Sequence, residues 1–494
     1  MFLIRGEWCK LRQFDDGGQS YTMSYIEGED RGQRVLFPEV LDDYITEENA
    51  VRFIDVFVDG LNMDEMGFLN PEPKGTGRPP YDPRDLLKLY IYGYLNRVRS
   101  SRRLEQECQR NVEVMWLVRK LRPDFKTVAD FRKDNRKAFK GVFRQFVLLC
   151  KGLGLLGGEL VAVDGSKFKA VNSGQRNFGR KRLEKSLKEI DKKVEGYLAE
   201  MDWTDQAEKQ TELTAEELKQ KIAKLKERKG RYEELLKELK ASGESQISLT
   251  DRDSRAMALT PKGEISYNVQ TAVDSKHHLI VAQEVVNEGS DNHQLLAMGQ
   301  SAKEILGQEK LQVVADMGYY HHEQLRESEE AGITAYVAKP IVSNSRRGLW
   351  GKEKFIYEPD FYGCPAGERL TFQFESKGRK QKKFRYYWTT ACGSCSLKSR
   401  CTTNKKFRII KRWEHEEILE RIGNRVKANL QVMRLRQQIV EHPFGTIKFW
   451  ADQRHFLMKG LEKVKAEFSL STLAYDIKRA INVVGIKRLI LALA

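Results

Sequence analysis

The stretch GELVAVDGSK, from Gly158 to Lys167, decides the fold of this chain. The run Leu160–Val163 is short, apolar and bounded by glycines, which is typical of a strand buried on both faces of a sheet. We expect the strand to end on Asp164 and the chain to turn at Gly165. Open α/β sheets bind ligands at the ends of their central strands, so Asp164 is a candidate functional carboxylate. The alternative is an Asp that only caps the next turn.

A second stretch repeats this pattern. The apolar run from Gln312 to Ala315 ends on Asp316, and a glycine follows two positions later. Two strands that each end on an Asp predict two carboxylates that converge at one sheet edge. Hard divalent cations such as Mg²⁺ are held by carboxylates of this kind together with substrate phosphates.

Glu441 is the candidate for a third acid. It lies in IVEHPFG, and the polar stretch before it, from Glu416 to Gln438, has apolar residues at helical intervals. We expect a helix that carries Glu441 to the sheet. The alternative is a glutamate at a helix end that faces solvent.

The spacing of apolar runs predicts the rest of the sheet. Strands at 267–274 and 279–286 would form an antiparallel unit with the Leu160 strand. Alternation of strand and helix predicts parallel pairing for the Asp316 strand and for a strand at 333–337. Before the Asp316 strand, a helix at 295–306 would begin after Asp291 or Asn292 as its cap.

Three blocks, VAVDGSKF, VVADMGYY and IVEHPFGTIK, resemble the acidic blocks of bacterial insertion-sequence DDE transposases of the IS4-like/IS1182 family. Further blocks strengthen the resemblance, because DRDSR at 251–255, YNVQTAVD at 267–274 and LAYDIKR at 473–479 are similar to DPDAR, YNVQ-AVD and LAYNIKR in that family. The resemblance runs from about Val35 to the end of the chain. It implies an α/β fold with an RNase H-like catalytic core.

The resemblance also implies a function. The chain would be a DNA transposase that binds the terminal inverted repeats of a mobile element and catalyses metal-dependent strand cleavage and strand transfer. Asp164, Asp316 and Glu441 would hold two Mg²⁺ ions, replaceable by Mn²⁺, while Arg436 and Lys448 would contact phosphate near the cut. The partners would be double-stranded DNA, both element ends and target, and a second copy of the chain in the synaptic complex.

The chain departs from the family pattern at two positions. Met433 stands where the family has a Tyr that helps to position DNA, and Asp476 replaces an Asn. Two other functions stay open: a catalytically inactive DNA-binding protein descended from a transposase, and an RNase H-like nuclease that cuts without joining. The three acids argue against the first, and a long N-terminal helical region argues against the second.

Composition indicates a polyanionic partner. The 494 residues carry a formal net charge of +16, and Lys and Arg gain affinity by displacing counterions from phosphates. A generically basic soluble protein is the alternative. No apolar run approaches the ~18 residues of a membrane span, and the start of the chain, MFLIRGEWCK, does not resemble a secretory signal. We therefore expect a cytoplasmic protein without a membrane partner, and the resemblance implies that it is bacterial and nucleoid-associated.

We expect an N-terminal arm over residues 1–34, a helical DNA-binding domain over 35–150, and a catalytic core over 151–340 and 413–494. In the helical domain, Asp82 and Pro83 would begin a helix as its cap and first residue. The cation-rich run that follows is typical of phosphate contacts, although a solvated helix surface is the alternative. The candidates are Arg97, Arg99, Arg102 and Arg103.

Two insertions separate the three acids. Residues 176–242 are highly charged, with apolar residues every three or four positions, and predict a helical hairpin. Its charges alternate in sign, which favours a solvated arm, and the alternative is contact with a partner or clamping of DNA. Residues 341–412 are rich in cysteine, and four thiolates at such spacing can hold a structural Zn²⁺ in a knuckle, or stay unligated and reduced. Cations and aromatics around them can hold a DNA backbone and stack on bases, or form a solvated basic loop. The cysteines are Cys364, Cys392, Cys395 and Cys401.

Overall fold

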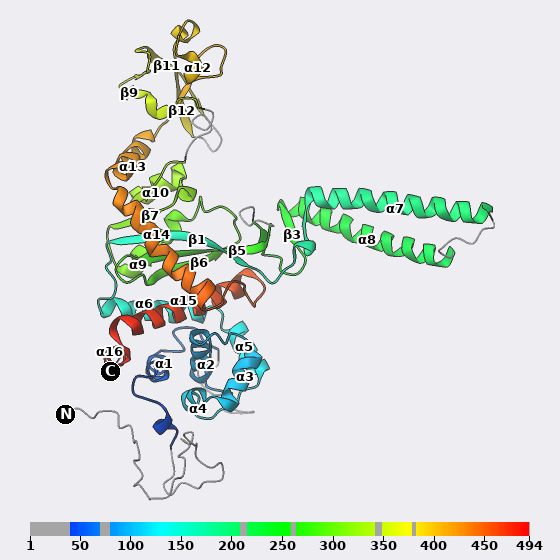
Figure 1. Cartoon of the computed structure of the whole chain (residues 1–494), viewed down its shortest axis with the longest axis vertical. Helices are drawn as coiled ribbons and strands as arrows, with labels where there is room; N and C mark the ends of the chain where they lie inside the picture. The colour runs from blue at the N-terminus through cyan, green and yellow to red at the C-terminus, as the bar shows by residue number, and fades with distance from the viewer. Residues whose placement is uncertain are drawn as a thin grey trace, which may run out of the picture.

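The computed structural model describes residues 40–69, 80–207, 215–257, 263–340, 348–377 and 382–493. These residues form an elongated molecule with a mixed α/β centre, a group of helices below it and a small sheet above it in the view of Figure 1. A long helical hairpin projects sideways from the centre (Figure 1). The expected N-terminal arm, residues 1–34, lies outside the described residues.

The centre is a six-stranded mixed sheet with the order β4-β5-β1-β7-β8, in which β6 pairs with β5. As predicted, β1, β5 and β6 pair antiparallel, while β7 and β8 run parallel to β1. The strands are β1 Leu160–Lys169, β4 Arg255–Ala256, β5 Ile265–Asp274, β6 Ile280–Val286, β7 Leu311–Ala315 and β8 Ile333–Val337.

The predicted turn at Gly165 is wrong. Strand β1 continues to Lys169, and every residue from Val161 to Lys169 stays paired with β5. The apolar run ends at Asp164 because the second half of the strand faces polar neighbours, and not because the strand ends there. Asp164 therefore lies inside a strand that is held by neighbours on both sides.

Helices cover the sheet. Helix α9 (Leu295–Leu306) packs on β6, β5, β1 and β7, and α10 (His322–Glu330) packs on α9 and β8. Helix α14 (Leu430–Gly445) packs on β1, β7 and β5, and α15 (Leu461–Val484) packs on β6. The aromatic ring of Phe168, on β1, contacts Phe444 of α14 and Phe468 of α15. Helix α13 (Glu416–Ala428) precedes α14, and α16 (Ile486–Leu491) follows α15.

The N-terminal helices share one apolar core with the sheet. Helix α15 packs on both α2 and α6, so it joins these helices to the sheet. Asp82 caps α2 and Pro83 is its first residue, as predicted. The helices are α1 Ala50–Asp59, α2 Pro83–Leu95, α3 Ser101–Arg110, α4 Val112–Leu117, α5 Phe125–Asp134 and α6 Ala138–Gly152.

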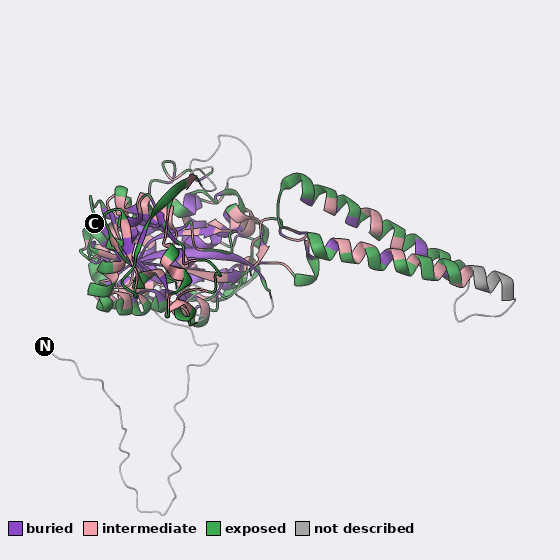
Figure 2. Cartoon of the chain, turned by 90° about the horizontal axis from the view of Figure 1, so that it is seen from above, coloured by how far each residue is buried: buried purple, intermediate pink, exposed green. Residues whose placement is uncertain are grey.

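The projecting hairpin consists of α7 (Arg180–Ala207) and α8 (Ala215–Ser242), which agrees with the predicted helical pair. It stands on a two-stranded ribbon of β2 (Asn177–Gly179) and β3 (Gln246–Ser248). Its apolar cluster, which includes Leu183, Ile190 and Leu235, is separate from the main core. Figure 2 shows buried residues concentrated in the body of the molecule and scattered along the hairpin.

The cysteine-rich insertion forms a five-stranded antiparallel sheet with the order β13-β12-β11-β10-β9, larger than the expected knuckle. The short helix α12 (Lys398–Cys401) lies between β12 and β13. No helix in the described parts of the chain is long and apolar enough to cross a membrane. The strands are β9 Ile356–Glu358, β10 Phe361–Gly363, β11 Arg369–Lys377, β12 Lys383–Trp388 and β13 Ile410–Trp413.

Candidate active site

Asp164 and Asp316 lie on neighbouring strands. Val163 pairs with Ala315 in parallel register, so the two aspartates that follow them are adjacent at one place in the sheet. Burial raises the pKa of Asp164 to about 6, and the charges of Asp316 and Asp291 add to the rise. Arg436 and the backbone N–H of Gly165 oppose it. The two predicted carboxylates are therefore close enough to repel each other.

Helix α14 delivers Arg436 to this pair. Its guanidinium Nη1 lies 3.3 Å from Oδ2 of Asp164. The helix continues into a π-helical turn, Thr446–Trp450, which carries Lys448. The ammonium of Lys448 donates to Ser166 Oγ at 2.6 Å and to the carbonyl oxygen of Lys167 at 2.9 Å. Two cations predicted near the acids are thus in place beside β1.

Glu441 lies on α14 between these two cations, but the structure does not bring its carboxylate to the aspartates. Its side chain is exposed and accepts a hydrogen bond from Gln437 Nε2 at 2.7 Å. The charges that act most on Asp164 are those of Arg436, Asp316 and Asp291, and not that of Glu441. Two of the three predicted acids are therefore assembled, and the third stands on the adjoining helix.

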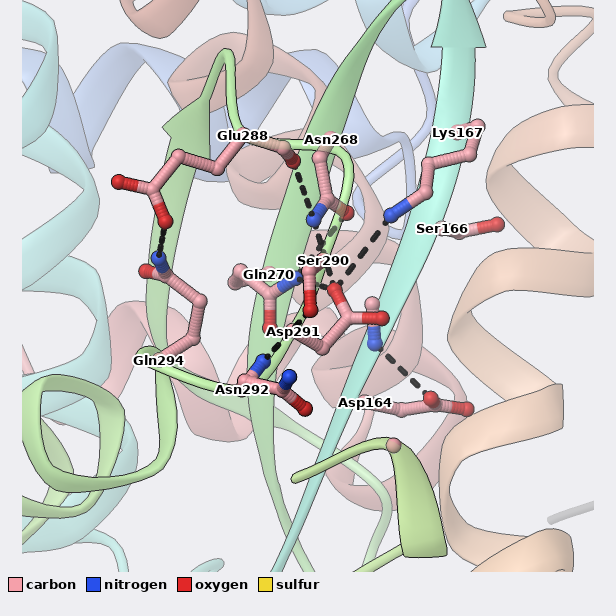
Figure 3. Close-up of polar contacts among 12 residues, drawn as sticks. Asp164, Ser166, Lys167, Asn268, Gln270, Glu288, Ser290, Asp291, Asn292 and Gln294 are labelled. Atoms are coloured by element: carbon pink, nitrogen blue, oxygen red, sulfur yellow. Dashed lines mark hydrogen bonds and ion pairs between the residues drawn. The ribbon is translucent and has the colours of Figure 1, made fainter. Parts of the chain in front are cut away.

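Asp291 is an acid of this site that the sequence analysis missed. Its Oδ1 accepts hydrogen bonds from the side-chain amides of Asn268 and Gln270, each at 2.7 Å, and lies 3.4 Å from the ammonium of Lys167 (Figure 3). The prediction that Asp291 or Asn292 caps α9 is wrong, because the N-cap residue is Gln294. A usable signal was present in β5, where two polar amides occur two residues apart in a strand buried along its length, since buried amides need partners.

Gly165 is required by close approach. A Cβ at this position would lie 2.3 Å from Gln270 Nε2 and 2.7 Å from Asp291 Oδ1, so the amide cluster occupies the space of its missing side chain. The hydroxyl of Tyr319 donates to Gln270 Oε1, and Tyr319 belongs to the turn that follows Asp316. One buried hydrogen-bond network therefore connects the backbone beside Asp164 to the turn beside Asp316.

Three of the four predicted DNA-contact arginines are exposed. Arg97, Arg102 and Arg103 present their side chains to solvent, and the guanidinium of Arg97 lies 4.3 Å from the ring centre of Trp450. Arg99 is different, with 10% of its side chain exposed.

Arg99 is occupied by the protein itself. It donates to the carbonyl oxygens of His455 (2.9 Å) and Asp452 (3.1 Å), and it lies 3.5 Å from the buried carboxylate of Glu467. These contacts favour a structural role for Arg99, because a buried carboxylate needs a cation, and a DNA contact of Arg99 stays a prediction. Arg99 joins the N-terminal helices to the segment between α14 and α15.

The four predicted cysteines of the insertion line one small cavity, together with Trp350 and Arg408. Burial raises the pKa of Cys401, and the other three thiols add to the rise, so all four lie within electrostatic range. The donor types suit Zn²⁺, as the aspartate oxygens suit Mg²⁺. Among the residues that the structure describes, however, no group of three or more His, Cys, Asp or Glu side chains is arranged to hold a metal ion.

Comparisons with known proteins match both ends of the chain. A family model described as a transposase domain (DUF772) matches residues 39–134, and one described as a transposase DDE domain matches residues 363–481. The second match contains Glu441 and the strands β11, β12 and β13 of the insertion sheet. No curated protein matches the chain significantly. The cryo-EM structure of a piggyBac transposase synaptic complex with hairpin DNA is 8% identical and covers 90% of this chain and 84% of that chain, and its TM-score of 0.25 carries no further inference.

Proposed function

We propose that this chain is a DDE transposase of an insertion sequence of the IS4-like/IS1182 kind, which cleaves and joins DNA at the terminal inverted repeats of its element; the matches to a transposase domain and a transposase DDE domain support this. The observation that carries the proposal is the adjacency of Asp164 and Asp316 on parallel strands, with Arg436 on Asp164. Two carboxylates in mutual repulsion are a site prepared for cations.

Asp164 and Asp316 would hold divalent metal ions, and Glu441 would complete the set. The bound metal ions supply activation of the attacking oxygen and stabilisation of the leaving oxygen. Arg436 offsets part of the negative charge that gathers on Asp164 before any DNA is present. Glu441 lies between Arg436 and Lys448 on the same helical segment, and both of those side chains reach β1. A Glu441 side chain released from its hydrogen bond with Gln437 would turn toward the two aspartates.

Lys448 would position a DNA phosphate at the site. Burial lowers the pKa of the Lys448 ammonium, and the charge of Lys167 lowers it further. A phosphate anion bound beside Lys448 would therefore stabilise its charged form. Its hydrogen bonds to Ser166 and to the carbonyl of Lys167 fix the ammonium against β1, two to three residues beyond Asp164. A phosphate held there would lie beside the carboxylates.

The other regions would have separate tasks. Residues 35–150 would bind the element ends through exposed cations such as Arg97, Arg102 and Arg103, residues 151–340 and 413–494 would form the catalytic core, and residues 341–412 would be a domain stabilised by zinc. Two copies would pair two element ends. An inactive DNA-binding descendant remains the second candidate, because Met433 packs against the apolar core where the family has a Tyr.

The test is Mg²⁺-dependent processing of a labelled DNA that carries the repeats flanking the gene. Nicking at the repeat terminus followed by joining should be lost in Asp164→Ala and Asp316→Asn, while end binding stays within a few-fold. Asp191→Asn, on the distant hairpin, is the matched control. Cutting by Asp316→Asn would refute the metal assignment, and specific binding by the wild type without cutting would support the inactive descendant.

Zinc is tested by metal analysis of the purified chain. We expect close to one equivalent, because a structural zinc site binds tightly enough to survive purification, and less than about half an equivalent would contradict the proposal. Cys395→Ser should lose the metal. Cys108→Ala should keep it, since Cys108 is buried among the N-terminal helices.

A further inference from the structure

The two faces of the insertion sheet differ. One face is closed by an apolar cluster that includes Tyr362, Leu370 and Tyr387. The cavity lined by the four cysteines adjoins this cluster at Leu370. The opposite face carries four partly or fully exposed aromatic side chains, which lie outside the apolar clusters formed by the described residues. We call it the aromatic face, and its members are Phe374, Tyr386, Trp388 and Phe407.

The rings of the aromatic face are ordered among themselves. Phe374 stacks on Tyr386 with ring centres 4.6 Å apart and planes at 9°, and Trp388 stacks on Phe407 at 5.0 Å and 3°. Phe374 also meets Trp388 edge-on at 5.8 Å. Phe374 keeps 44% of its surface exposed although it has these neighbours. The face therefore presents a pre-ordered set of flat rings to solvent.

A β-bulge separates Phe374 from Phe372. Because of the extra residue, Phe372 pairs with Tyr387 and contacts its ring on the closed face, while Phe374 pairs with Tyr386 on the aromatic face. Phe372 is 46% exposed, so the two phenylalanines differ in face and hardly in exposure. They form a natural pair of test and control positions.

The charge around the aromatic face is strongly positive. Residues 341–412 contain 18 Lys and Arg against five Asp and Glu, a net charge of +13 out of +16 for the whole chain. The ammonium of Lys411 lies 5.1 Å from the ring centre of Tyr386, and the exposed Lys405 and Lys406 directly precede Phe407. Glu375 pairs with Arg385, a residue on the opposite side of β12 from Tyr386. The surroundings of these rings therefore favour a polyanion.

We propose that the aromatic face binds an unpaired stretch of DNA, with bases stacked on Phe374 and its neighbours and phosphates held by the surrounding lysines. Flat exposed rings between cations are the elements of single-strand recognition, because every base has a face that can stack and every nucleotide carries a charge. A protein partner would not explain the charge excess, and duplex DNA would not explain the rings. The inference rests on the proposed function, since strand cleavage at an element end supplies unpaired DNA.

The experiment measures binding alone, with the full-length chain as purified and without added Mg²⁺ or Mn²⁺, and therefore without cutting. Fluorescence anisotropy with labelled oligothymidine and with a duplex of equal length gives two affinities for each variant. Phe374→Ala should weaken single-strand binding roughly tenfold and leave duplex binding nearly unchanged, because one stacked base is lost. Phe372→Ala should change neither. An oligonucleotide with 2-aminopurine should show quenched fluorescence on binding the wild type and less quenching with Phe374→Ala.

Three outcomes overturn the inference: equal effects of Phe372→Ala and Phe374→Ala, equal loss of duplex and single-strand affinity, or unchanged quenching. Phe374→Trp keeps a ring at the position and should retain affinity, which excludes a folding defect as the cause of any loss. If the proposed function is wrong, the result differs: the wild-type protein binds single strands but does not cut DNA at the repeat terminus. Unchanged single-strand binding by Phe374→Ala in a protein that still cuts removes this inference alone.

Discussion

At the scale of single residues, the site depends on a glycine and an aspartate that sequence patterns misassigned. Gly165 has no side chain, and Gln270 and Asp291 fill the space beside it. Oδ1 of Asp291 accepts hydrogen bonds from two side-chain amides and pairs with the ammonium of Lys167. Asp164 extends from the strand one residue before this space. We therefore expect the position of its carboxylate to depend on this cluster of polar side chains.

Gly165→Ala tests this dependence. The added Cβ must displace Gln270 or Asp291, so we expect a loss of roughly 1–3 kcal/mol in the free energy of unfolding and a large loss of DNA cleavage. Urea unfolding followed by circular dichroism and a cleavage assay measure both effects. Gly174→Ala is the control, because nothing lies within 4 Å of its added Cβ. Full activity of Gly165→Ala would show that the cluster does not position Asp164.

Asp476 makes a second prediction at this scale. Its carboxyl is fully buried, Oδ1 accepts from the N–H of Ile280 at 2.9 Å, and Oδ2 has no partner among the described residues. Burial raises the pKa of Asp476 well above its usual value, so the folded chain holds a proton that the unfolded chain releases. Stability that depends on this group is therefore present below the usual pKa of Asp and falls as the pH rises above it.

Asp476→Asn removes that titration. We expect the variant to be more stable than the wild type at pH 8, by about 1 kcal/mol or more, and nearly equal at pH 4. Thermal melts across this range give the difference as a function of pH. Asp452→Asn, an exposed position, should show no such trend. A constant difference at all pH values would mean that Asp476 is not protonated in the folded chain.

At the scale of helices and strands, apolar periodicity predicted most of the structure. The strands β1, β5, β6, β7 and β8, their directions, and the helical hairpin all follow from runs and spacings of apolar residues, because burial sets those spacings. The end of β1 could not be predicted this way. Its second half is held by backbone pairing with β5 and carries polar residues, which apolar periodicity does not detect.

Sequence patterns located the site only in part. The two aspartates could be predicted because each directly follows an apolar run, and the parallel pairing of these runs then brings them together. Arg99 could not, since its role depends on Glu467, far along the chain. The two buried amides of β5 indicated that a polar partner exists, but not that this partner is Asp291. Long-range partners of polar side chains leave no periodic trace in the sequence.

The helical hairpin gives a prediction at this scale. Its apolar cluster is separate from the main core, and the ribbon of β2 and β3 closes its base. In the test variant, a short glycine linker replaces residues 180–242, and Phe178→Thr and Ile247→Thr remove the apolar side chains that this deletion exposes. The melting temperature should stay within about 4 °C of the wild type. Calorimetry measures this. A melting temperature far below that of the wild type would show that the hairpin stabilises the core.

At the scale of the whole molecule, one buried ion pair helps to hold the N-terminal helices on the body of the central sheet. Glu467 is 1% exposed and also accepts hydrogen bonds from the backbone N–H groups of Leu457 and Met458. Arg99 reaches this carboxylate from the junction between α2 and α3, and it ties down two carbonyl oxygens of the same segment. The segment leads from the π-helical turn with Lys448 to α15, so the contact connects the N-terminal helices to the helices that pack on the central sheet.

Arg99→Met should therefore destabilise the chain by roughly 3–5 kcal/mol, because it leaves a buried carboxylate without its cation. Adding Glu467→Gln should recover part of the loss, and a double-mutant cycle from urea unfolding gives the coupling. Arg84→Met, which removes an exposed pair with Asp82, should change the free energy of unfolding by less than about 1 kcal/mol. If Arg99→Met instead keeps its stability and loses affinity for element ends, Arg99 contacts DNA, and the N-terminal helices are held by their shared apolar core alone.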